Sequence, residues 1–394
     1  MAALDGIVVL DLTHVVAGPF CTMMMGDQGA NVIKVERPGK GDHIRAWPPS
    51  WNGTASAFLA LNRNKRSIAI DFQQPRGADV VRALAAKADV VVESFRPGSL
   101  AKHGLAYEQI RELNPRVIYC SISGYGQTGP LAELGGYDLI AQAFGGLMST
   151  TGQPEGPSVR AGYSVVDTFA GMSAYGAVMT ALLQRERTGQ GQYVETSLLD
   201  AVVAQMSYHA TGYLATGKIP GRLGTASPSL VPYQQFQSAD ADFIMGCNND
   251  VSWRRLCTAL ARPDLATDPR FTTNADRLRN KELLIGMLSE IFRTQSATHW
   301  VTLFNAHQVP SSRINTVADV VHDEQVAARD LLPAIPHPAI PDLRAPATPF
   351  KLVGASAAPI KPPPGLGEHS GAILEELGFS IEDVEALRSA GVVG

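Results

Sequence analysis

Short runs of valine and isoleucine dominate the first third of the chain. Apolar runs of strand length lie at 6–14, 31–36, 66–72, 88–95 and 116–126, and helical stretches at 75–87 and 97–113 separate the last three. A short helix is expected after Gly18 and Pro19. Because strands covered on both faces lack polar alternation, this pattern predicts an α/β fold with a parallel sheet between helices. Such sheets bind ligands beyond the carboxyl ends of their strands.

The loops at that edge are rich in glycine, proline, serine and arginine. They read THVVAGP, ERPGKGD, ESFRPGS and SGYGQTGP. No GxGxxG follows the first strand, and no Walker A sequence occurs. Dinucleotide and P-loop chemistry are therefore disfavoured.

The pattern changes after residue 215. Helices are predicted at 137–149, 168–187 and 196–216, and 1–215 is interpreted as the first part of a large domain. A linker at 216–230 leads to a smaller α+β domain at 231–325, with a strand inside ADADFIMGCNND. The proline-rich segment 326–367 is too long for an ordinary loop and is interpreted as an extended return linker. Helices in 368–394 should dock elsewhere.

Composition excludes several classes of protein. The 394 residues suffice for two or three domains, and no apolar run reaches the roughly 18 residues that span a bilayer. The start, MAALDGIVVLDLTH, has no basic region and is not expected to be a signal peptide. The four cysteines form no CxxC pair and the nine histidines no metal-binding spacing, so we expect no disulfide, no metal and a cytoplasmic protein. A net charge of −4 gives no reason to expect nucleic acid or a membrane as partner.

One stretch departs from this charge balance. Residues 31–70 hold seven basic residues and two acidic ones. A solvated basic face and a site for a polyanionic small molecule, such as a nucleotide or coenzyme A, both fit the excess. The basic residues are Lys34, Arg37, Lys40, Arg45, Arg63, Lys65 and Arg66.

Asp167 is the strongest candidate for chemistry. It precedes TFAGMSAYGA and is interpreted as the N-cap of the helix that follows, a role for which aspartate is favoured. However, the small residues of this helix would let another group approach its backbone closely. A carboxylate beside free helical amides can also be a nucleophile toward an activated acyl group, with the amides stabilising the oxyanion. Both interpretations stay open at this point.

Other candidates are weaker. His14 lies at the end of the first strand, at the predicted ligand edge, where a structural role and a ligand role are both reasonable. No GxSxG elbow occurs. Asp138 and Asp200 lie on predicted helices and are expected to be surface or capping groups.

Seven segments in order resemble the class III CoA-transferases, the family of formyl-CoA transferase and carnitine CoA-transferase. The resemblance runs nearly end to end. The segments are LDGIVVLDLTHVVAGPFCTMMMGDQGANVIKVERPGKGDHIR, LNRNKRSIAID, ADVVVESFRPGSL, LNPRVIYCSISGYGQTGP, GGYDLIAQAFGGLMSTTG, VVDTFAGMSAYGAVMTALLQRERTGQGQYVETSLLD and PPPGLGEHS.

The resemblance implies that Asp167 forms an acyl anhydride with the donor and then an aspartyl-CoA thioester. It also implies a Rossmann-like large domain built from both termini, an interlocked ring-like homodimer, and acyl-CoA as a substrate without a bound cofactor. The positions that match the family's CoA contacts are His14, Val15, Ala17, Arg37, Ser94, Phe95 and Lys102, and Arg45 is added from the basic stretch.

Departures from the family concern the acceptor. Val16 replaces the glutamine of formyl-CoA transferase, and the glycine-rich lid is reduced to MGCNND around Gly246, which disfavours formyl-CoA and oxalate. Tyr137 and Asp138 stand where α-methylacyl-CoA racemases carry histidine and aspartate, and tyrosine is a poor base near neutral pH. Tyr137 and Asp138 are instead candidates for orienting the acyl group, with simple packing as the alternative, and Val16 and Gly246 are further candidates for contact with the substrate. We therefore expect a succinyl-CoA-like donor and a small dicarboxylate acceptor, with Arg45 or Arg96 for the spare carboxylate. A racemase or epimerase, or a CoA-binding protein without turnover, remains the alternative.

Overall fold

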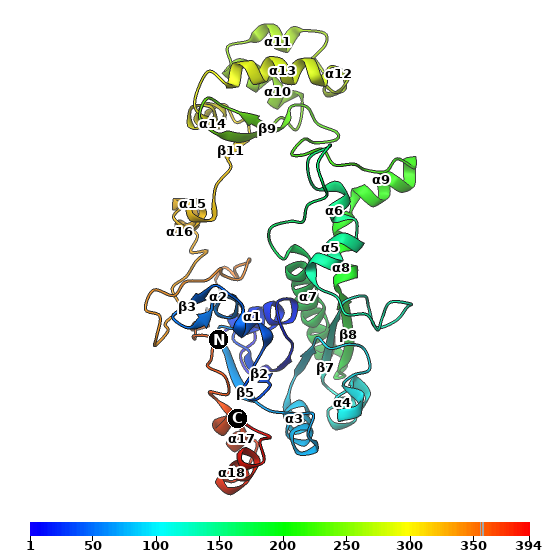
Figure 1. Ribbon diagram of the computed structural model, residues 1–394, viewed down its shortest axis with the longest axis vertical. Coiled ribbons are helices and arrows are strands. Elements are labelled where there is room, and N and C mark those ends of the chain that lie inside the picture. The colour runs from blue at the N-terminus through cyan, green and yellow to red at the C-terminus, as the bar shows by residue number, and fades with distance from the viewer. Residues whose placement is uncertain (355, 357) are drawn as a thin grey trace. The chain divides into compact units, whose positions relative to one another are not determined.

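A six-stranded parallel sheet organises the larger of the two units into which the chain divides (Figure 1). The structure, a computed structural model, describes residues 1–354, 356 and 358–394. The larger unit consists of residues 1–147, 160–217 and 327–394, and the smaller unit of residues 148–159 and 218–326.

The parallel α/β sheet predicted from the sequence is confirmed. Its strand order is β5-β2-β1-β6-β7-β8 and every neighbouring pair is parallel. The last strand was not predicted, because its mixture of polar and apolar residues lacks the valine and isoleucine run of the others. The strands are β1 (Val8–Leu12), β2 (Asn31–Glu36), β5 (Lys65–Ala69), β6 (Val90–Glu93), β7 (Ile118–Ser123) and β8 (Gln192–Ser197).

Helices cover both faces of this sheet, and two apolar clusters form between the layers. One face packs against α1 (Ala17–Asp27), α7 (Val165–Thr188) and α8 (Leu198–Met206). The other packs against α3 (Pro75–Lys87), α4 (Tyr107–Leu113), α17 (Ser370–Glu376) and α18 (Ile381–Ser389). Because both faces are buried, the strands need apolar side chains in both directions.

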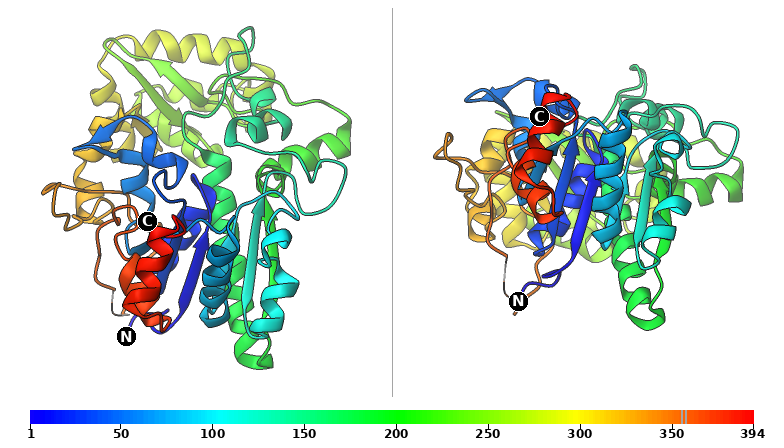
Figure 2. Two further views of the ribbon diagram at one scale, coloured as in Figure 1. Left: turned by 60° about the horizontal axis from the view of Figure 1, so that its bottom comes forward. Right: turned by 90° about the horizontal axis from the view of Figure 1, so that it is seen from below.

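The end of the chain completes one edge of the sheet. Val393 forms an antiparallel bridge with Ile70, and the amide of Gly394 donates to the carbonyl of Ala69 at 3.0 Å. Figure 2 shows α17 and α18, in red, beside the blue N-terminal strands. Residues distant in sequence therefore share one hydrophobic core.

Helix α7 is the core helix of this unit. Within the described residues it alone is long and apolar enough to cross a membrane by composition, with a mean hydropathy of 1.2. Its small residues Ala170, Ala174 and Ala181 are buried in the cluster with α1, and the buried Arg185 near its end pairs with Asp89 at 3.0 Å. One side of α7 therefore packs against the core, while Phe169 and Leu183 on it are exposed.

Several predicted helices have different bounds in the structure. The stretch 97–113 contains a short 3-10 turn, η2 (Ala101–His103), before α4, and 137–149 contains α5 (Asp138–Phe144) and the start of α6 (Leu147–Thr150). The stretch 196–216 is split at Ser207, whose φ of 43° interrupts the helix before α9 (Tyr208–Thr216). The remaining elements of this unit are η1 (His43–Ala46), β3 (Ser50–Trp51), β4 (Thr54–Ala55) and α2 (Ser56–Leu61).

The smaller unit contains an antiparallel sheet of order β11-β10-β9 with helices packed on it. Its strands are β9 (Tyr233–Gln237), β10 (Asp242–Gly246) and β11 (Ser311–Arg313). Its longer helices are α10 (Asp250–Ala259), α13 (Lys281–Phe292) and α14 (Ala297–Ala306). The shorter ones are α11 (Pro263–Thr267), α12 (Asn274–Arg279) and α15 (Val317–Val321). Helix α16 (Glu324–Ala328) begins in the smaller unit and ends in the larger one.

Candidate functional site

The candidate site lies at the carboxyl edge of the sheet between β1 and β6. From β1 the chain adds β2 and β5 on one side, and it then adds β6, β7 and β8 on the other. Strand β1 lies between β2 and β6, so the loops that follow β1 and β6 leave the sheet side by side. The amide of His14, after β1, donates to the hydroxyl of Ser94, after β6, at 3.0 Å. Open α/β sheets bind their ligands at such a point.

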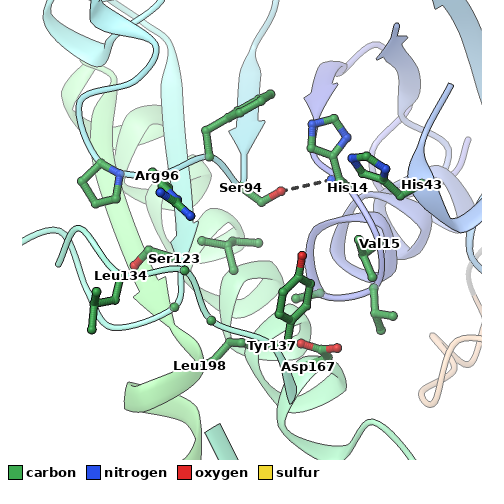
Figure 3. A pocket seen from close by; sticks show the side chains of 18 residues that line it. His14, Val15, His43, Ser94, Arg96, Ser123, Leu134, Tyr137, Asp167 and Leu198 are labelled. Carbon is green, nitrogen blue, oxygen red and sulfur yellow. Dashed lines mark hydrogen bonds between the residues drawn. The ribbon is translucent and has the colours of Figure 1, made fainter. Parts of the chain in front are cut away.

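A cavity of about 450 Å³ lies at this point (Figure 3). It brings together most of the residues predicted from the sequence, from both loops and from the start of α7. The predicted residues that line it are His14, Val15, Val16, Ala17, Ser94, Phe95, Arg96, Tyr137 and Asp167.

A second cavity, of about 500 Å³, shares three lining residues with the first. The shared residues are His14, His43 and Phe95. Arg37 and Lys40 also line the second cavity and bring two cations to it. The acidic residues of its wall are Glu36 and Asp42, which are paired with Arg45 and Lys34, and Asp71. An extended anionic ligand could lie across both cavities with its charged end beside these cations.

Most of the basic excess in 31–70 is neutralised within the fold. Five of its seven cations pair with carboxylates, and no ion pair of Arg37 or Lys40 is found among the described residues. Arg45, predicted as a CoA contact, is held by Glu36 through two contacts of 2.6 and 2.7 Å. The pairs are Lys34–Asp42, Arg45–Glu36, Arg63–Asp27, Lys65–Asp11 and Arg66–Glu376.

Four predicted site residues line neither cavity: Arg45, Asp138, Lys102 and Gly246. Lys102 is exposed in η2 and lines neither cavity. Gly246 is buried at the end of β10 in the smaller unit. Their proposed contacts with CoA and acyl group stay predictions.

Asp167 is not the N-cap of its helix, which corrects the sequence interpretation. Helix α7 begins at Val165, so Asp167 lies in its first turn. The capping carboxylate comes instead from Asp138, whose Oδ1 accepts from the amides of Val166 at 2.9 Å and Asp167 at 3.2 Å. Gln142 donates to the other oxygen of Asp138 at 2.5 Å. Asp138 is thus the capping group predicted as one possibility, and it does not line the cavity.

The amides at the start of α7 are not free to stabilise an oxyanion, which corrects a second expectation. Those of Val166 and Asp167 donate to Asp138, and that of Thr168 donates to the carbonyl of Ser164 at 3.0 Å. The amide of Val165 donates to the carbonyl of Tyr163. Oxyanion stabilisation would therefore require other donors.

Burial raises the pKa of Asp167 to about 7, and the nearby carboxylate of Asp138 adds to this effect. Near neutral pH, the carboxylate is therefore poised between its protonated and nucleophilic forms. Burial, followed by the charge of Lys34, lowers the pKa of His14, so the imidazole that lines both cavities is neutral.

Gly171 allows α7 to lie very close to the first residue of α1. A Cβ atom on Gly171 would lie 2.4 Å from the carbonyl oxygen of Ala17, far inside van der Waals contact. Gly171 lies one turn after Asp167 on α7, and Ala17 begins α1. The close approach inferred from the small residues of α7 is therefore present, between α7 and the loop that lines the cavity.

Two residues of the site escaped the sequence analysis. His43 lines both cavities, and Asp42 accepts from the amide of Val15 at 3.1 Å. Both belong to the GDHIR segment after β2. The position of this segment after β2, at the carboxyl edge of the sheet, could have indicated both residues. The sequence analysis used Asp42 only as one of the two acidic residues in 31–70.

Comparison with known proteins decides the family. The model of CoA-transferase family III matches residues 4–370. The chain belongs to this family. It is 42% identical to succinyl-CoA:glutarate CoA-transferase of Mus musculus over 395 residues, covering 100% of this chain and 91% of the relative. It is 40% identical to succinate–glutarate CoA-transferase of Agrobacterium fabrum (strain C58), covering 95% of each. A CAIB/BAIF family protein from Brucella suis has a TM-score of 0.85 and 39% identity, covering 95% of this chain and 99% of that one.

The resemblance to class III CoA-transferases and the prediction of an enzyme are thereby confirmed. The curated relatives above are named as transferases, which favours transfer over racemisation or binding without turnover. Among the described residues of this CoA-transferase, no group of three or more histidine, cysteine, aspartate or glutamate side chains is arranged to hold a metal ion.

Proposed function

We propose that this CoA-transferase moves CoA from a succinyl-CoA-like donor to a small dicarboxylate, with Asp167 as the nucleophile. The observation that carries the proposal is the shared cavity: Asp167, loop 14–17 and Arg96 line one space, which adjoins the second cavity with Arg37 and Lys40. The phosphates of CoA would lie beside these two cations, and its thioester beside Asp167.

Asp167 would work by covalent catalysis in balanced steps. Its carboxylate attacks the thioester carbonyl of the donor, which releases CoA thiolate and leaves an acyl-aspartyl anhydride. The thiolate then attacks the aspartyl carbonyl, which releases the donor acid and forms an aspartyl-CoA thioester. The acceptor carboxylate attacks that thioester, which releases CoA thiolate and forms an anhydride between the acceptor and Asp167. The thiolate then attacks the acceptor's carbonyl, which forms the new acyl-CoA and frees the Asp167 carboxylate. Each step conserves the energy of the thioester, which hydrolysis would lose.

Mass spectrometry can test this assignment. Purified protein is incubated with succinyl-CoA alone, and the peptide that contains Asp167 should carry a CoA or succinyl adduct. Addition of glutarate should remove the adduct while glutaryl-CoA forms. Succinyl-CoA turnover with the modification on another residue would reject Asp167, and deuterium uptake at the α-carbon of a 2-methylacyl-CoA would support the racemase instead.

Arg96 is the better of the two candidates for the spare carboxylate of the acceptor. Arg45 is already bound by Glu36, whereas no ion pair of Arg96 is found in the described part of the chain and Arg96 lines the cavity of Asp167. A guanidinium can hold a carboxylate through two parallel hydrogen bonds. Two of the relatives described above are named for glutarate, which supports a dicarboxylate acceptor.

Substitution of Arg96 should therefore change acceptor selectivity. R96Q should lower the ratio of kcat/KM for glutarate to that for butyrate by roughly 30-fold, the loss expected for one charge-assisted pair. Steady-state assays with both acids measure the ratio. R111Q, on the exposed surface of α4, is the control and should leave it unchanged. An unchanged ratio in R96Q would remove Arg96 from acceptor recognition.

The homodimer implied by the family likeness is part of this proposal. Large apolar side chains are exposed on α5, α7 and α8, which contact one another, and on α9, which follows α8 in the chain. Their number is larger than the surface of an isolated chain normally carries. They are Leu139, Ile140, Phe144, Phe169, Leu183, Val203, Tyr208, Tyr213 and Leu214. Sedimentation equilibrium should give twice the mass of one chain down to nanomolar concentration. A concentration-dependent monomer would contradict an interlocked dimer.

A further inference from the structure

Val15 has a backbone conformation that a β-branched residue rarely adopts. Its φ is +67°, in the left-handed region that favours glycine. Val15 follows His14 in the loop that lines the cavity of Asp167. Such a conformation persists only where the surroundings hold it, and it is often found at functional sites.

The buried ion pair between Lys34 and Asp42 stabilises this conformation of Val15. The amide of Val15 donates to the carboxylate of Asp42, at 3.1 Å to Oδ1 and 3.3 Å to Oδ2. Asp42 also accepts from the amide of Ile44 at 3.1 Å, and Lys34 lies 3.0 Å from its Oδ2. The side chains of Lys34 and Asp42 are both fully buried. The charges of the pair are therefore shielded from competing water and salt.

The same two side chains form hydrogen bonds with the loop backbone on both sides of His14. Lys34 donates to the carbonyl of Thr13 at 2.9 Å, while Asp42 accepts from the amide of Val15. Ser94 adds a third contact by accepting from the amide of His14. Three consecutive residues of the loop are thus held by side chains from β2, from the loop before η1 and from the loop after β6.

We propose that the Lys34–Asp42 pair is a positioning device that holds residues 13–15 in the conformation that binds acyl-CoA. Neither side chain lines the cavity of Asp167, and Lys34 lines neither cavity. Asp42 belongs to the wall of the second cavity, but its side chain is fully buried against Lys34, so its contact with the loop is through the amide of Val15. Loss of Asp42 lets Val15 relax toward an ordinary conformation and deforms the wall that His14 and Val15 provide. The inference rests on the proposed position of acyl-CoA against this loop.

The affinity for CoA is the decisive measurement. D42A should raise the Kd of CoA in calorimetry by roughly 30-fold, because it removes charge-assisted hydrogen bonds from the loop. D42N keeps an oxygen acceptor for the amides and should raise it only about 5-fold. In both variants, kcat at saturating acyl-CoA should change less than the affinity. If D42A fails to fold, the milder D42N still tests the inference.

The control is a similar carboxylate at the other end of β1. Asp89 accepts from the amide of Val8 at 2.9 Å and pairs with the buried Arg185, but it lines neither cavity. D89A and D89N should lower the melting temperature and leave the Kd of CoA within about twofold of wild type, since they test general damage to the sheet. A similar loss of CoA affinity in D89A and D42A would overturn the positioning role.

A second substitution tests the route through Val15. Glycine adopts a φ of +67° without support, so D42A should cost much less CoA affinity in the V15G background than in the wild type. Equal costs in the two backgrounds would contradict the inference. Transfer by the wild-type chain together with unaltered CoA affinity in D42A and D42N would reject this inference alone, whereas a wild-type chain that fails to transfer CoA would reject the proposed function first.

Discussion

The Asp167→Asn variant should lose CoA transfer by at least about 1,000-fold and yet be more stable than the wild type at pH 8. The loss follows from removing the proposed nucleophile, for which an amide is no substitute. The gain follows from the pKa of Asp167, which burial and then Asp138 raise from the ordinary value of 3.8 to about 7. A folded-state pKa above the unfolded value means that the ionised carboxylate opposes folding.

The sign of this effect sets the pH window. Below about pH 4 the carboxyl is protonated in both states and D167N should match the wild type. Between about pH 4 and pH 7 the wild type should lose stability relative to the variant, and above pH 7 the difference should be constant. It should be on the order of 2 kcal/mol, about half of what the full pKa difference gives, because Asp167 is partly open to water. Urea unfolding at pH 4, 6 and 8 measures it.

The pH dependence of the wild-type rate gives an independent check. Because the ionised form attacks, kcat/KM for the donor should rise about tenfold per pH unit below pH 7 and level off above it. D138N removes the neighbouring charge but keeps an acceptor for the amides of α7, so its midpoint should move to lower pH. A D167N variant that transfers CoA, or that matches wild-type stability at every pH, would contradict the assignment of Asp167.

The second large effect concerns the contact between α1 and α7. The Gly171→Ala variant should lose about 2 kcal/mol of stability and most of its activity. Its new methyl group would lie 2.4 Å from the carbonyl oxygen of Ala17 and 3.2 Å from Cδ1 of Phe20, so the two helices must move apart. Ala17 and Asp167 line the same cavity, and a displacement between them separates loop from nucleophile.

Gly286 provides the matched control for this substitution. It lies in the middle of α13, and no atom lies within 4 Å of a Cβ placed on it. G286A should therefore leave activity unchanged and should gain up to about 1 kcal/mol from the higher helix propensity of alanine. Thermal unfolding and steady-state assays on both variants make the comparison. Equal tolerance of G171A and G286A would show that the close contact does not matter.

The sequence predicts the sheet better than it predicts the partners of individual side chains. Runs rich in valine and isoleucine identify β1, β2, β5, β6 and β7, because strands buried on both faces admit little else. Strand β8 lies at the sheet edge and contains Glu195 and polar neighbours, so the same criterion misses it. Asp167 could be proposed as the nucleophile because small residues and the family likeness both pointed to the start of one helix.

The electrostatics of the site could not be predicted in the same way. The carboxylates that neutralise Arg63, Lys65 and Arg66 come from Asp27, Asp11 and Glu376, which lie outside the basic stretch in sequence. Likewise, the carboxylate that caps α7 comes from Asp138 on another helix. Charges within one segment indicate a ligand site only when the carboxylates that the fold brings to them are known.

The position of the chain's end has a consequence for biosynthesis. The edge of β5 is completed by residues from 370 to 394, about 300 residues after that strand has been made. At ordinary translation rates of roughly 5–20 residues per second, residues 370–394 are made at least about 15 seconds after β5. Residues 218–326 form most of the smaller unit and emerge earlier as one stretch. Residues 218–326 should therefore be able to fold on the ribosome before residues 370–394 complete the edge of β5.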